Sequence, residues 1–245
     1  MSLKIALLGY GKMGKEVERT ALQHGFEIIV KIDTPEEWAK HYGEVPLADV
    51  AIDFSTPDAV LHNIDRCFDL NIPLVVGTTG WYEHLEEVKS RCISEGKSMI
   101  YAPNFSIGMN IFFEMNKHLA KLMNHHSEYD VWMEEIHHIH KLDAPSGTAI
   151  TLANDIISNI SRKQKWNNML SDQSDELGIR SVRQEEVPGI HTVTYESDAD
   201  TIEIKHTAKG RKGLAQGAIV AAEWIKDKKG FFTMKDLLKQ KMTSE

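Results

Sequence analysis

Three histidines and a lysine stand close together near the middle of the chain, at His137, His138, His140 and Lys141. Histidine titrates near neutral pH, so it is well suited to donate a proton to a substrate. An Asp-Ala-Pro turn then leads to Ser146, a residue type that often caps the start of a helix. The N–H groups that follow, near Gly147 and Thr148, can bind an anion. This spacing predicts a proton donor beside a carboxylate site, and so a small anionic substrate.

Two other interpretations of the histidine cluster remain open. Histidines at the end of a strand are often only solvated polar residues. A metal site is the second alternative, but neighbouring residues of a strand point to opposite faces, so the three histidines cannot share one face. Cys67 and Cys92 lie far upstream, so no thiolate cluster favours zinc. Glu134, Glu135 and Asp143 are the only further ligands nearby, and we predict that no metal is bound.

The composition is that of an ordinary globular protein. The chain has 245 residues, 42% hydrophobic and 26% charged, which suits one large domain or two modest ones. A net charge of −8 opposes general nucleic-acid binding, although a local basic pocket can still hold an anion. Two cysteines give no disulfide framework, and the N-terminal apolar run is too short for a signal peptide. No stretch approaches the roughly 18 apolar residues of a membrane span. We expect a cytoplasmic protein.

The N-terminal segment predicts a dinucleotide-binding site. A strand is expected over residues 4–8, and it is followed at once by Gly9-Tyr10-Gly11-Lys12-Met13-Gly14 and a helix over residues 12–23. In this context the glycines let the backbone approach a pyrophosphate, and the helix N-terminus stabilises its charge. A second strand over residues 26–32 ends in Asp33, near the usual offset for a carboxylate that binds the adenosine ribose. The alternative role of Asp33 is that of a polar loop or capping residue.

Strands and helices alternate over the first part of the chain. Further strands are expected over residues 50–54, 73–76 and 98–101, with helices between them. This alternation predicts a parallel sheet, whose ligands bind at the carboxyl ends of the strands. The cofactor-binding residues expected at that edge are Gly9, Tyr10, Gly11, Lys12, Met13, Gly14, Asp33, Gly77, Thr78, Thr79, Ala102, Pro103, Asn104 and Phe105.

The pattern changes after residue 106. A helix is expected with an apolar stripe of Ile111, Met115, Leu119 and Leu122, and the polar stretch after residue 160 predicts a loop. Short turns then separate three strands, which favours antiparallel pairing. The expected elements are helices over 107–123, 149–160, 214–225 and 233–239, and strands over 129–136, 179–186, 189–197 and 201–206.

We therefore predict an α/β fold in two parts. The first is a Rossmann-like parallel-sheet nucleotide-binding domain, over residues 1–106 and 216–245. The second is an α+β substrate-binding and tetramerisation domain with a mainly antiparallel or mixed sheet, over residues 107–215. The two terminal helices are expected to pack back on the first sheet.

The segment EIHHIHKLDAPSGTA, residues 135–149, resembles the E-x-H-H-x-H-K-x-D-A-P-S-G-T-A motif of the 4-hydroxy-tetrahydrodipicolinate reductase (dihydrodipicolinate reductase) family. Residues 77–80, 102–106 and 217–218 fit the same family, and the resemblance covers essentially the whole chain. It implies an oxidoreductase of lysine and diaminopimelate biosynthesis. The implied reaction is the NAD(P)H-dependent reduction of 4-hydroxy-tetrahydrodipicolinate, a small dicarboxylate, to tetrahydrodipicolinate. The implied assembly is a homotetramer, without nucleic-acid or membrane partners.

The resemblance also implies roles for individual residues. His137 corresponds to the general acid and Lys141 to a second proton donor or substrate clamp, while His138, Gly147 and Thr148 bind substrate. If the segment is extended, His137 and Lys141 project to the same side.

The sequence departs from the family pattern in three ways. The glycine loop is a residue shorter than the common form, with Lys12 where arginine is frequent. Thr34 follows Asp33 where some members carry an arginine suited to a 2′-phosphate, and the chain between Asp33 and Asp49 lacks a longer insertion. We therefore expect NADH or NADPH to serve, with NADH at least as good.

Two rival functions stay in view. A dehydrogenase of a sugar or an amino-acid semialdehyde would use Lys141 and a histidine differently. An NADH-sensing regulator would bind the cofactor without chemistry, although the negative charge and the lack of a DNA-reading module oppose it.

Overall fold

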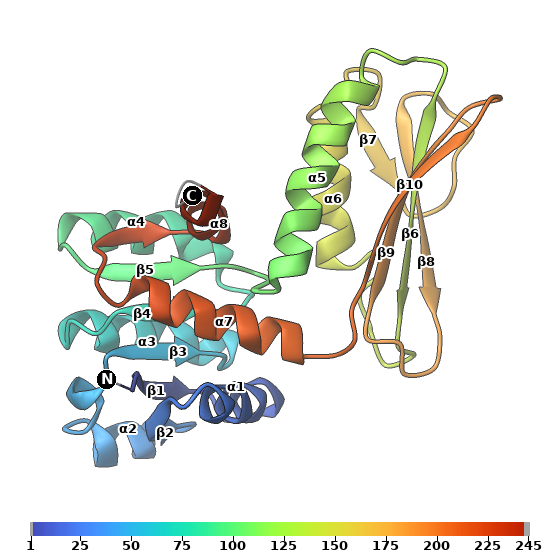
Figure 1. The fold of residues 1–245 in the computed structure, drawn as a ribbon. Helices are drawn as coiled ribbons and strands as arrows, with labels where there is room; N and C mark the ends of the chain where they lie inside the picture. The colour runs from blue at the N-terminus through green and yellow to red at the C-terminus, as the bar shows by residue number, and fades with distance from the viewer. Residues whose placement is uncertain (1, 243–245) are drawn as a thin grey trace. The chain divides into compact units, whose positions relative to one another are not determined.

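The computed structural model describes residues 2–242, and its chain divides into two compact units. Unit 1 consists of Met1–Ile107 and Arg211–Glu245, and unit 2 consists of Gly108–Gly210. Each unit contains its own sheet (Figure 1). Unit 1 is therefore discontinuous in sequence, with unit 2 inserted into it.

Unit 1 is built on a six-stranded sheet in the order β11-β5-β4-β3-β1-β2, and every pairing in it is parallel. Its central strands are buried on both faces, which explains their continuous apolar sequences. The strands are β1 (Lys4–Leu8), β2 (Glu27–Ile32), β3 (Val50–Asp53), β4 (Leu74–Val76), β5 (Ser98–Tyr101) and β11 (Gly230–Phe232).

Helices cover both faces of this sheet (Figure 1). One apolar core contains residues of α1 (Lys12–Gln23), α7 (Lys212–Ile225) and α8 (Met234–Met242). The other contains residues of α2 (Pro35–His41), α3 (Pro57–Asp69) and α4 (Leu85–Ser94), with the short turns η1 (Val45–Leu47) and η2 (Tyr82–His84) at their ends. This doubly wound arrangement confirms the predicted Rossmann-like fold.

A helix and a strand of unit 1, α2 and β11, were not expected from the sequence. Helix α2 has seven residues and buries only Trp38, so its periodicity is too short to detect. It begins with a capping box, in which Thr34 caps the backbone of Glu37 and the Glu37 side chain returns to the cap. Strand β11 is three residues long and pairs with β5 after the chain has returned from unit 2.

Unit 2 contains a mixed sheet of five strands in the order β10-β9-β6-β8-β7. The pairs β6–β9 and β9–β10 are antiparallel, whereas β6–β8 and β7–β8 are parallel. Helices α5 (Ile107–Met123) and α6 (Gly147–Ile157) pack on one face of it (Figure 1). The strands are β6 (Asp130–His137), β7 (Lys165–Asn167), β8 (Glu176–Arg183), β9 (Ile190–Glu196) and β10 (Thr201–Thr207).

Three expectations for unit 2 were wrong in detail. Strands β8 and β9 are consecutive but do not pair, because β6 lies between them. The stretch predicted as a loop contains β7, where Trp166 packs against the core. Helix α5 buries Met109, Phe112 and Met123, whereas Ile111, Met115 and Leu122 are exposed. This helix carries apolar residues on more than one side, so periodicity could not choose the buried face.

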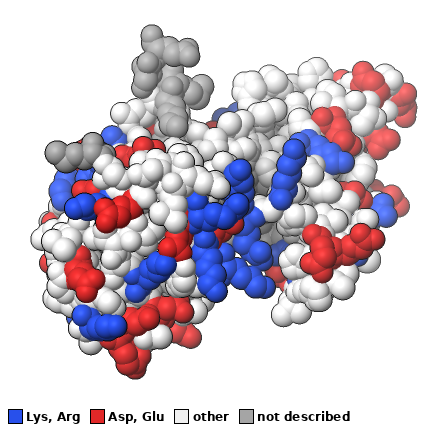
Figure 2. Space-filling model, turned by 60° about the horizontal axis from the view of Figure 1, so that its bottom comes forward, with Lys and Arg blue, Asp and Glu red and all other residues white. Residues whose placement is uncertain are grey.

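Two surface properties bear on possible partners. No helix among the described residues is long and apolar enough to cross a membrane. On the face shown in Figure 2, Lys and Arg side chains lie among Asp and Glu side chains, so the net charge of −8 is not a uniform acidic coat.

Candidate active site

The glycine loop after β1 has one glycine that faces open space between two that are packed. A Cβ on Gly9 would lie 2.4 Å from the carbonyl oxygen of Phe54, and one on Gly14 would lie 2.2 Å from the carbonyl oxygen of Gly9. A Cβ on Gly11 would meet no atom within 4 Å. The outer glycines therefore close the strand–turn–helix junction, and the middle one leaves room for a ligand to approach the backbone.

Asp33 lies directly after β2 and holds this loop. Its Oδ1 accepts a hydrogen bond of 2.6 Å from the backbone N–H of Tyr10. Its own backbone N–H donates to the Glu37 carboxylate at 2.6 Å. Lys31 places its ammonium 4.5 Å from the centre of the Tyr10 ring. Asp33 is thus a fixed carboxylate at the sheet edge, next to the glycine loop.

The ends of β3 and β4 are joined by a buried carboxylate, Asp53. It accepts hydrogen bonds from Thr78 Oγ1 (2.6 Å), Asn63 Nδ2 (2.7 Å), Ser55 Oγ (2.8 Å) and Ser55 N (3.0 Å). Burial raises the pKa of Asp53 more than these neutral donors lower it, so the pKa lies above its usual value. The Thr78 hydroxyl predicted to meet the cofactor is therefore already used inside unit 1.

The segment after β5 is held by helix α7. Asn104 accepts a hydrogen bond of 2.9 Å from the backbone N–H of Ser106, while Phe105 is buried. A Cβ on Gly217 of α7 would lie 1.7 Å from the carbonyl oxygen of Phe105, so only glycine permits this approach. Because all strands of the sheet are parallel, the segments that follow β1 to β5 lie at one edge, where the cofactor-binding residues were predicted.

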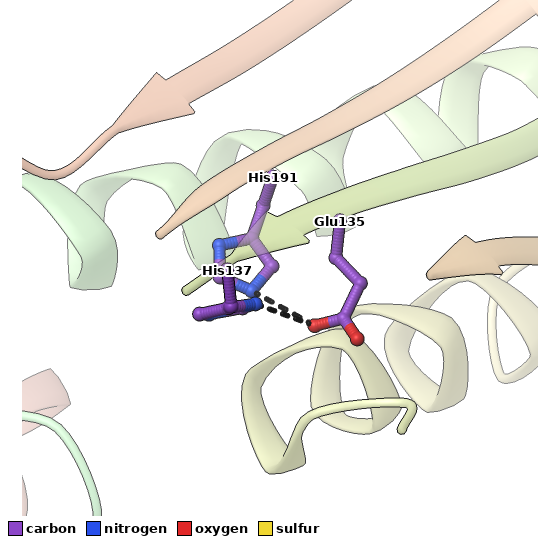
Figure 3. Close-up of side chains that lie close together, drawn as sticks. All are labelled: Glu135, His137 and His191. Atoms are coloured by element: carbon purple, nitrogen blue, oxygen red, sulfur yellow. Dashed lines mark ion pairs between the residues drawn. The ribbon is translucent and has the colours of Figure 1, made fainter. Parts of the chain in front are cut away.

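In unit 2, the strand register gathers four polar side chains around His137. His137 is the last residue of β6, and Arg183 of β8 lies opposite it. Two positions earlier on β6, Glu135 lies opposite Ser181 of β8 and His191 of β9. Glu135, His137 and His191 are all buried, and their side chains point toward one another (Figure 3).

Glu135 is the centre of this cluster. Its Oε2 lies 3.1 Å from His137 Nδ1 and 3.9 Å from His191 Nε2 (Figure 3). Its Oε1 accepts from the backbone N–H of Ser146 and from Arg183 Nη2, each at 3.1 Å. Burial alone would raise the pKa of Glu135, but hydrogen bonds from His137, Ser146 and Ser181 and the charge of His137 hold it well below its usual value. Glu135 is therefore an anion at neutral pH.

His191 has the opposite character. Burial, together with the charge of His137, lowers the pKa of His191 to about 3, so this imidazole is neutral. Its Nε2 lies 3.2 Å from Ser146 Oγ, and its ring meets that of His137 edge-on with centroids 5.1 Å apart. His191 thus packs against the His137 ring and adds no positive charge beside it.

Helix α6 presents its N-terminus beside this cluster. Ser146 is the N-cap, as predicted, and its Oγ accepts from the backbone N–H of Ala149 at 3.2 Å. Gly147 and Thr148 open the helix, and the first N–H groups of a helix have no intrahelical acceptor. A Cβ on Gly147 would meet no atom within 4 Å. These N–H groups can therefore hold a carboxylate.

Lys141 lies in a tight turn and not in an extended strand. β6 ends at His137, and the N–H of Lys141 donates to the His138 carbonyl at 3.1 Å. The alternation expected to place His137 and Lys141 on one side therefore does not apply. Lys141 Nζ lies 2.8 Å from Asp143 Oδ1. Arg183 donates to the carbonyl oxygens of Lys141 and Asp143 and so fixes the turn.

The other predicted histidines differ in exposure. His138 is half-buried, with its ring centre 6.1 Å from that of His140. His140 is exposed and lies 3.5 Å from Glu186. The structure therefore gives His140 no place in the buried cluster.

The cluster also bears on the question of a metal. Glu135, His137 and His191 bring one potential ligand atom each within 4.8 Å of one another. The Arg183 guanidinium already occupies Glu135 Oε1, however, and opposes a second cation there. Glu134 pairs with Arg180 at 3.5 Å and does not join the group. The arrangement fits the handling of a proton better than that of a dication.

Comparison with known proteins agrees with this geometry. Residues 3–105 match the family profile "Dihydrodipicolinate reductase, N-terminus", and residues 108–238 match "Dihydrodipicolinate reductase, C-terminus". The 4-hydroxy-tetrahydrodipicolinate reductase of Christiangramia forsetii is 50% identical over 96% of this chain and 98% of its own. That of Archaeoglobus fulgidus is 34% identical over 96% of this chain and 100% of its own.

A solved structure supports the fold. The dipicolinate-bound dihydrodipicolinate reductase from Paenisporosarcina sp. TG-14 has a TM-score of 0.75 at 24% identity, over 95% of this chain and 98% of that one. Both units are thus matched by sequence and by fold. This chain belongs to the dihydrodipicolinate reductase family.

Proposed function

We propose that this protein reduces 4-hydroxy-tetrahydrodipicolinate to tetrahydrodipicolinate with NADH or NADPH, in cytoplasmic lysine and diaminopimelate biosynthesis. Family membership makes it an oxidoreductase with a nicotinamide cofactor. The observation that carries the proposal is the site in unit 2. There the buried His137 and the N-cap of α6, Ser146, both contact the Glu135 carboxylate. A proton donor and an anion site are the two groups that this reaction needs from the protein.

The two units contribute different parts of the reaction. When bound, the cofactor supplies the hydride, and the glycine loop and Asp33 hold the dinucleotide. The N–H groups of Gly147 and Thr148, with His138, hold the substrate carboxylates. The related reductase from Paenisporosarcina sp. TG-14 binds dipicolinate, a dicarboxylate, and this supports the choice of a dicarboxylate substrate.

His137 donates its proton from Nε2. Its Nδ1 faces Glu135, so Nε2 is the nitrogen left for the substrate. A Cβ on Gly189 would lie 3.0 Å from Nε2, so the absence of a side chain there keeps the nitrogen open. Lys141 serves as a second donor or as a clamp on a carboxylate.

A single assay tests the reaction. Synthetic 4-hydroxy-tetrahydrodipicolinate is added to the protein with NADH, and cofactor oxidation is followed by absorbance. We expect turnover that a sugar or an amino-acid semialdehyde does not support. Cofactor binding without turnover would instead indicate the sensor.

We propose that both cofactors serve, with NADH at least as good. Asp33 favours a free ribose hydroxyl and repels a 2′-phosphate, while the exposed Lys12 partly offsets that repulsion. Steady-state kinetics with each cofactor check this. A preference for NADPH beyond about tenfold, or roughly 1.4 kcal/mol, would contradict the role of Asp33.

We also propose a homotetramer formed through unit 2. This unit exposes Ile111, Met115 and Leu122 on α5 and Ile202 on the edge strand β10, and association would bury such apolar surface. Light scattering at micromolar concentration measures the mass directly, and a monomer would refute the assembly.

A further inference from the structure

We propose that Glu135 is the positioning residue of this reaction, which rests on the proposed function. Its carboxylate holds His137 by Nδ1, stabilises the protonated imidazole that donates from Nε2, and fixes the N-terminus of α6 against the same group.

The contact between Glu135 and His137 is built into the sheet. Glu135 is fully buried at 0% exposure, and its Oε2 lies 3.1 Å from His137 Nδ1. Within residues 2–242, neither of these two atoms makes a hydrogen bond, so their contact is a close buried ion pair. A buried carboxylate oxygen and a buried ring nitrogen without other partners are expensive to leave apart, so each is the natural partner of the other.

Two other donors around Glu135 bind its Oε1, and its Oε2 faces His137. Arg183 of β8 and the Ser146 N–H at the start of α6 both bind Oε1, while Ser181 of β8 adds a further hydrogen bond. His191 of β9 is neutral, with its pKa lowered by burial. A neutral His191 adds no positive charge that would oppose protonation of His137.

Further charged or titratable groups lie in the turn after β6 and on β10. Lys141 and Asp143 lie in the turn that Arg183 binds, and they pair with each other at 2.8 Å. On β10, burial lowers the pKa of His206. His137, at 3.1 Å, is thus the histidine of this cluster that lies nearest the Glu135 carboxylate.

One carboxylate therefore serves the proton donor and the anion site together. Oε2 orients the His137 ring, and Oε1 holds the N-cap of the helix that binds the substrate carboxylate. Through Arg183, Oε1 is also linked to the turn that carries Lys141. A fixed distance between donor and anion site is what preorganised catalysis requires.

The test variant is Glu135→Gln, which keeps the size of the side chain and an Oε1 acceptor for Ser146 and Arg183. It removes the negative charge beside His137. The matched control is Glu134→Gln, which removes a charge from the adjacent residue of β6, a half-buried side chain that pairs with Arg180. For each protein, kcat, KM and the pH dependence of kcat/KM are measured with NADH and substrate.

We expect Glu135→Gln to lower kcat by about tenfold or more, with a smaller change in KM. The fall of kcat/KM toward high pH should begin at least about one pH unit lower than in the wild type, because an opposite charge within a few ångströms favours the protonated form. Glu134→Gln should follow the wild-type profile. A loss of kcat without a shift of this limb, or an unchanged kcat, overturns the proposal.

A measurement on the wild type covers the case in which Glu135→Gln does not fold. In ¹⁵N-labelled protein at high pH, the neutral His137 ring should carry its proton on Nδ1, facing Glu135. A proton on Nε2 instead overturns the proposal. A wild type without reductase activity would refute the proposed function and not this assignment, which the tautomer tests separately.

Discussion

Asp53 in unit 1 and Glu135 in unit 2 are fully buried carboxylates near the carboxyl ends of strands, and they have opposite properties. Asp53 ends β3, and Glu135 lies near the end of β6. Among residues 2–242, the groups that bind Asp53 are neutral hydroxyl, amide and backbone donors. Glu135 is bound by Arg183 and faces two imidazoles.

The pKa values follow from these partners. Burial raises the pKa of Asp53, and neutral donors do not reverse the effect. Burial also acts on Glu135, but its charged and hydrogen-bonding partners lower its pKa below the usual value. Asp53 thus ties two loops together, whereas Glu135 supplies a negative charge to the group beside it. Burial alone does not distinguish a structural carboxylate from a functional one; the charge of its partners does.

The largest effect should follow from Lys141→Ala, which removes the cation of the turn that Arg183 fixes. A clamp acts on bound substrate and on the transition state, so we expect kcat to fall, KM to rise, and kcat/KM to drop by more than about 10²-fold. NADH binding, measured by fluorescence, should be unchanged. A change in KM alone would remove Lys141 from the chemistry.

His137→Gln removes the partner of Glu135 and should lower kcat by roughly 10²-fold, the low end for general acid catalysis, with little change in KM. Steady-state kinetics with saturating NADH measure both parameters. Near-normal turnover would mean that the proton comes from another group, and would make Glu135 as structural as Asp53.

Asn63→Leu tests the other side of the comparison. Asn63 donates to Asp53 and accepts from Trp38 Nε1 at 2.6 Å, so the change leaves two buried polar groups unpaired. We expect the free energy of unfolding to fall by roughly 1–3 kcal/mol for each group, with kcat close to that of the wild type. Urea unfolding and kinetics on the same preparation check this. A fall in kcat as large as that for His137→Gln would give the Asp53 cluster a functional role.

The smallest effect concerns how the free energy of unfolding changes at acidic pH. Because the pKa of Glu135 is lowered from 4.5, its ionisation stabilises the fold above pH 4.5, and this contribution is lost as the pH falls toward the folded value. The raised pKa of Asp53 acts in the opposite sense, since protonation relieves a buried charge. The difference in unfolding free energy between wild type and Glu135→Gln should therefore shrink below about pH 4.5. A difference that does not change between about pH 7 and 4 would contradict the ionised state of Glu135.

The sequence pointed to the contiguous parts of both candidate sites and missed the neighbours that come from distant strands. His137, Lys141 and Ser146 are recognisable because their motif is local, and the glycine loop because its strand and helix are adjacent. Arg183 and His191 come from strands 48 and 56 residues beyond Glu135, and their place depends on the insertion of β6 between β8 and β9. In the sequence, Arg183 reads as a solvated charge.

The role of Glu135 was missed for the same reason. In the sequence, Glu135 is one of several acidic residues near a histidine, and the only role considered for it there was that of a metal ligand. Its alternation with His137 on β6 was visible, but nothing local shows that both side chains face the interior. Asp53, at the end of an apolar strand, gave no sign of the four donors that the folded loops direct at it.

The insertion of unit 2 within unit 1 also sets an order for synthesis. Helix α7 supplies Ala218, Ile219 and Ala222 to the core on one face of the first sheet, and these residues follow all of unit 2 in the chain. On the ribosome, α1 therefore covers only part of that face until α7 and α8 follow the contiguous unit 2. The nucleotide-binding unit begins first and finishes last, so chaperones that bind apolar surface should meet it during this interval.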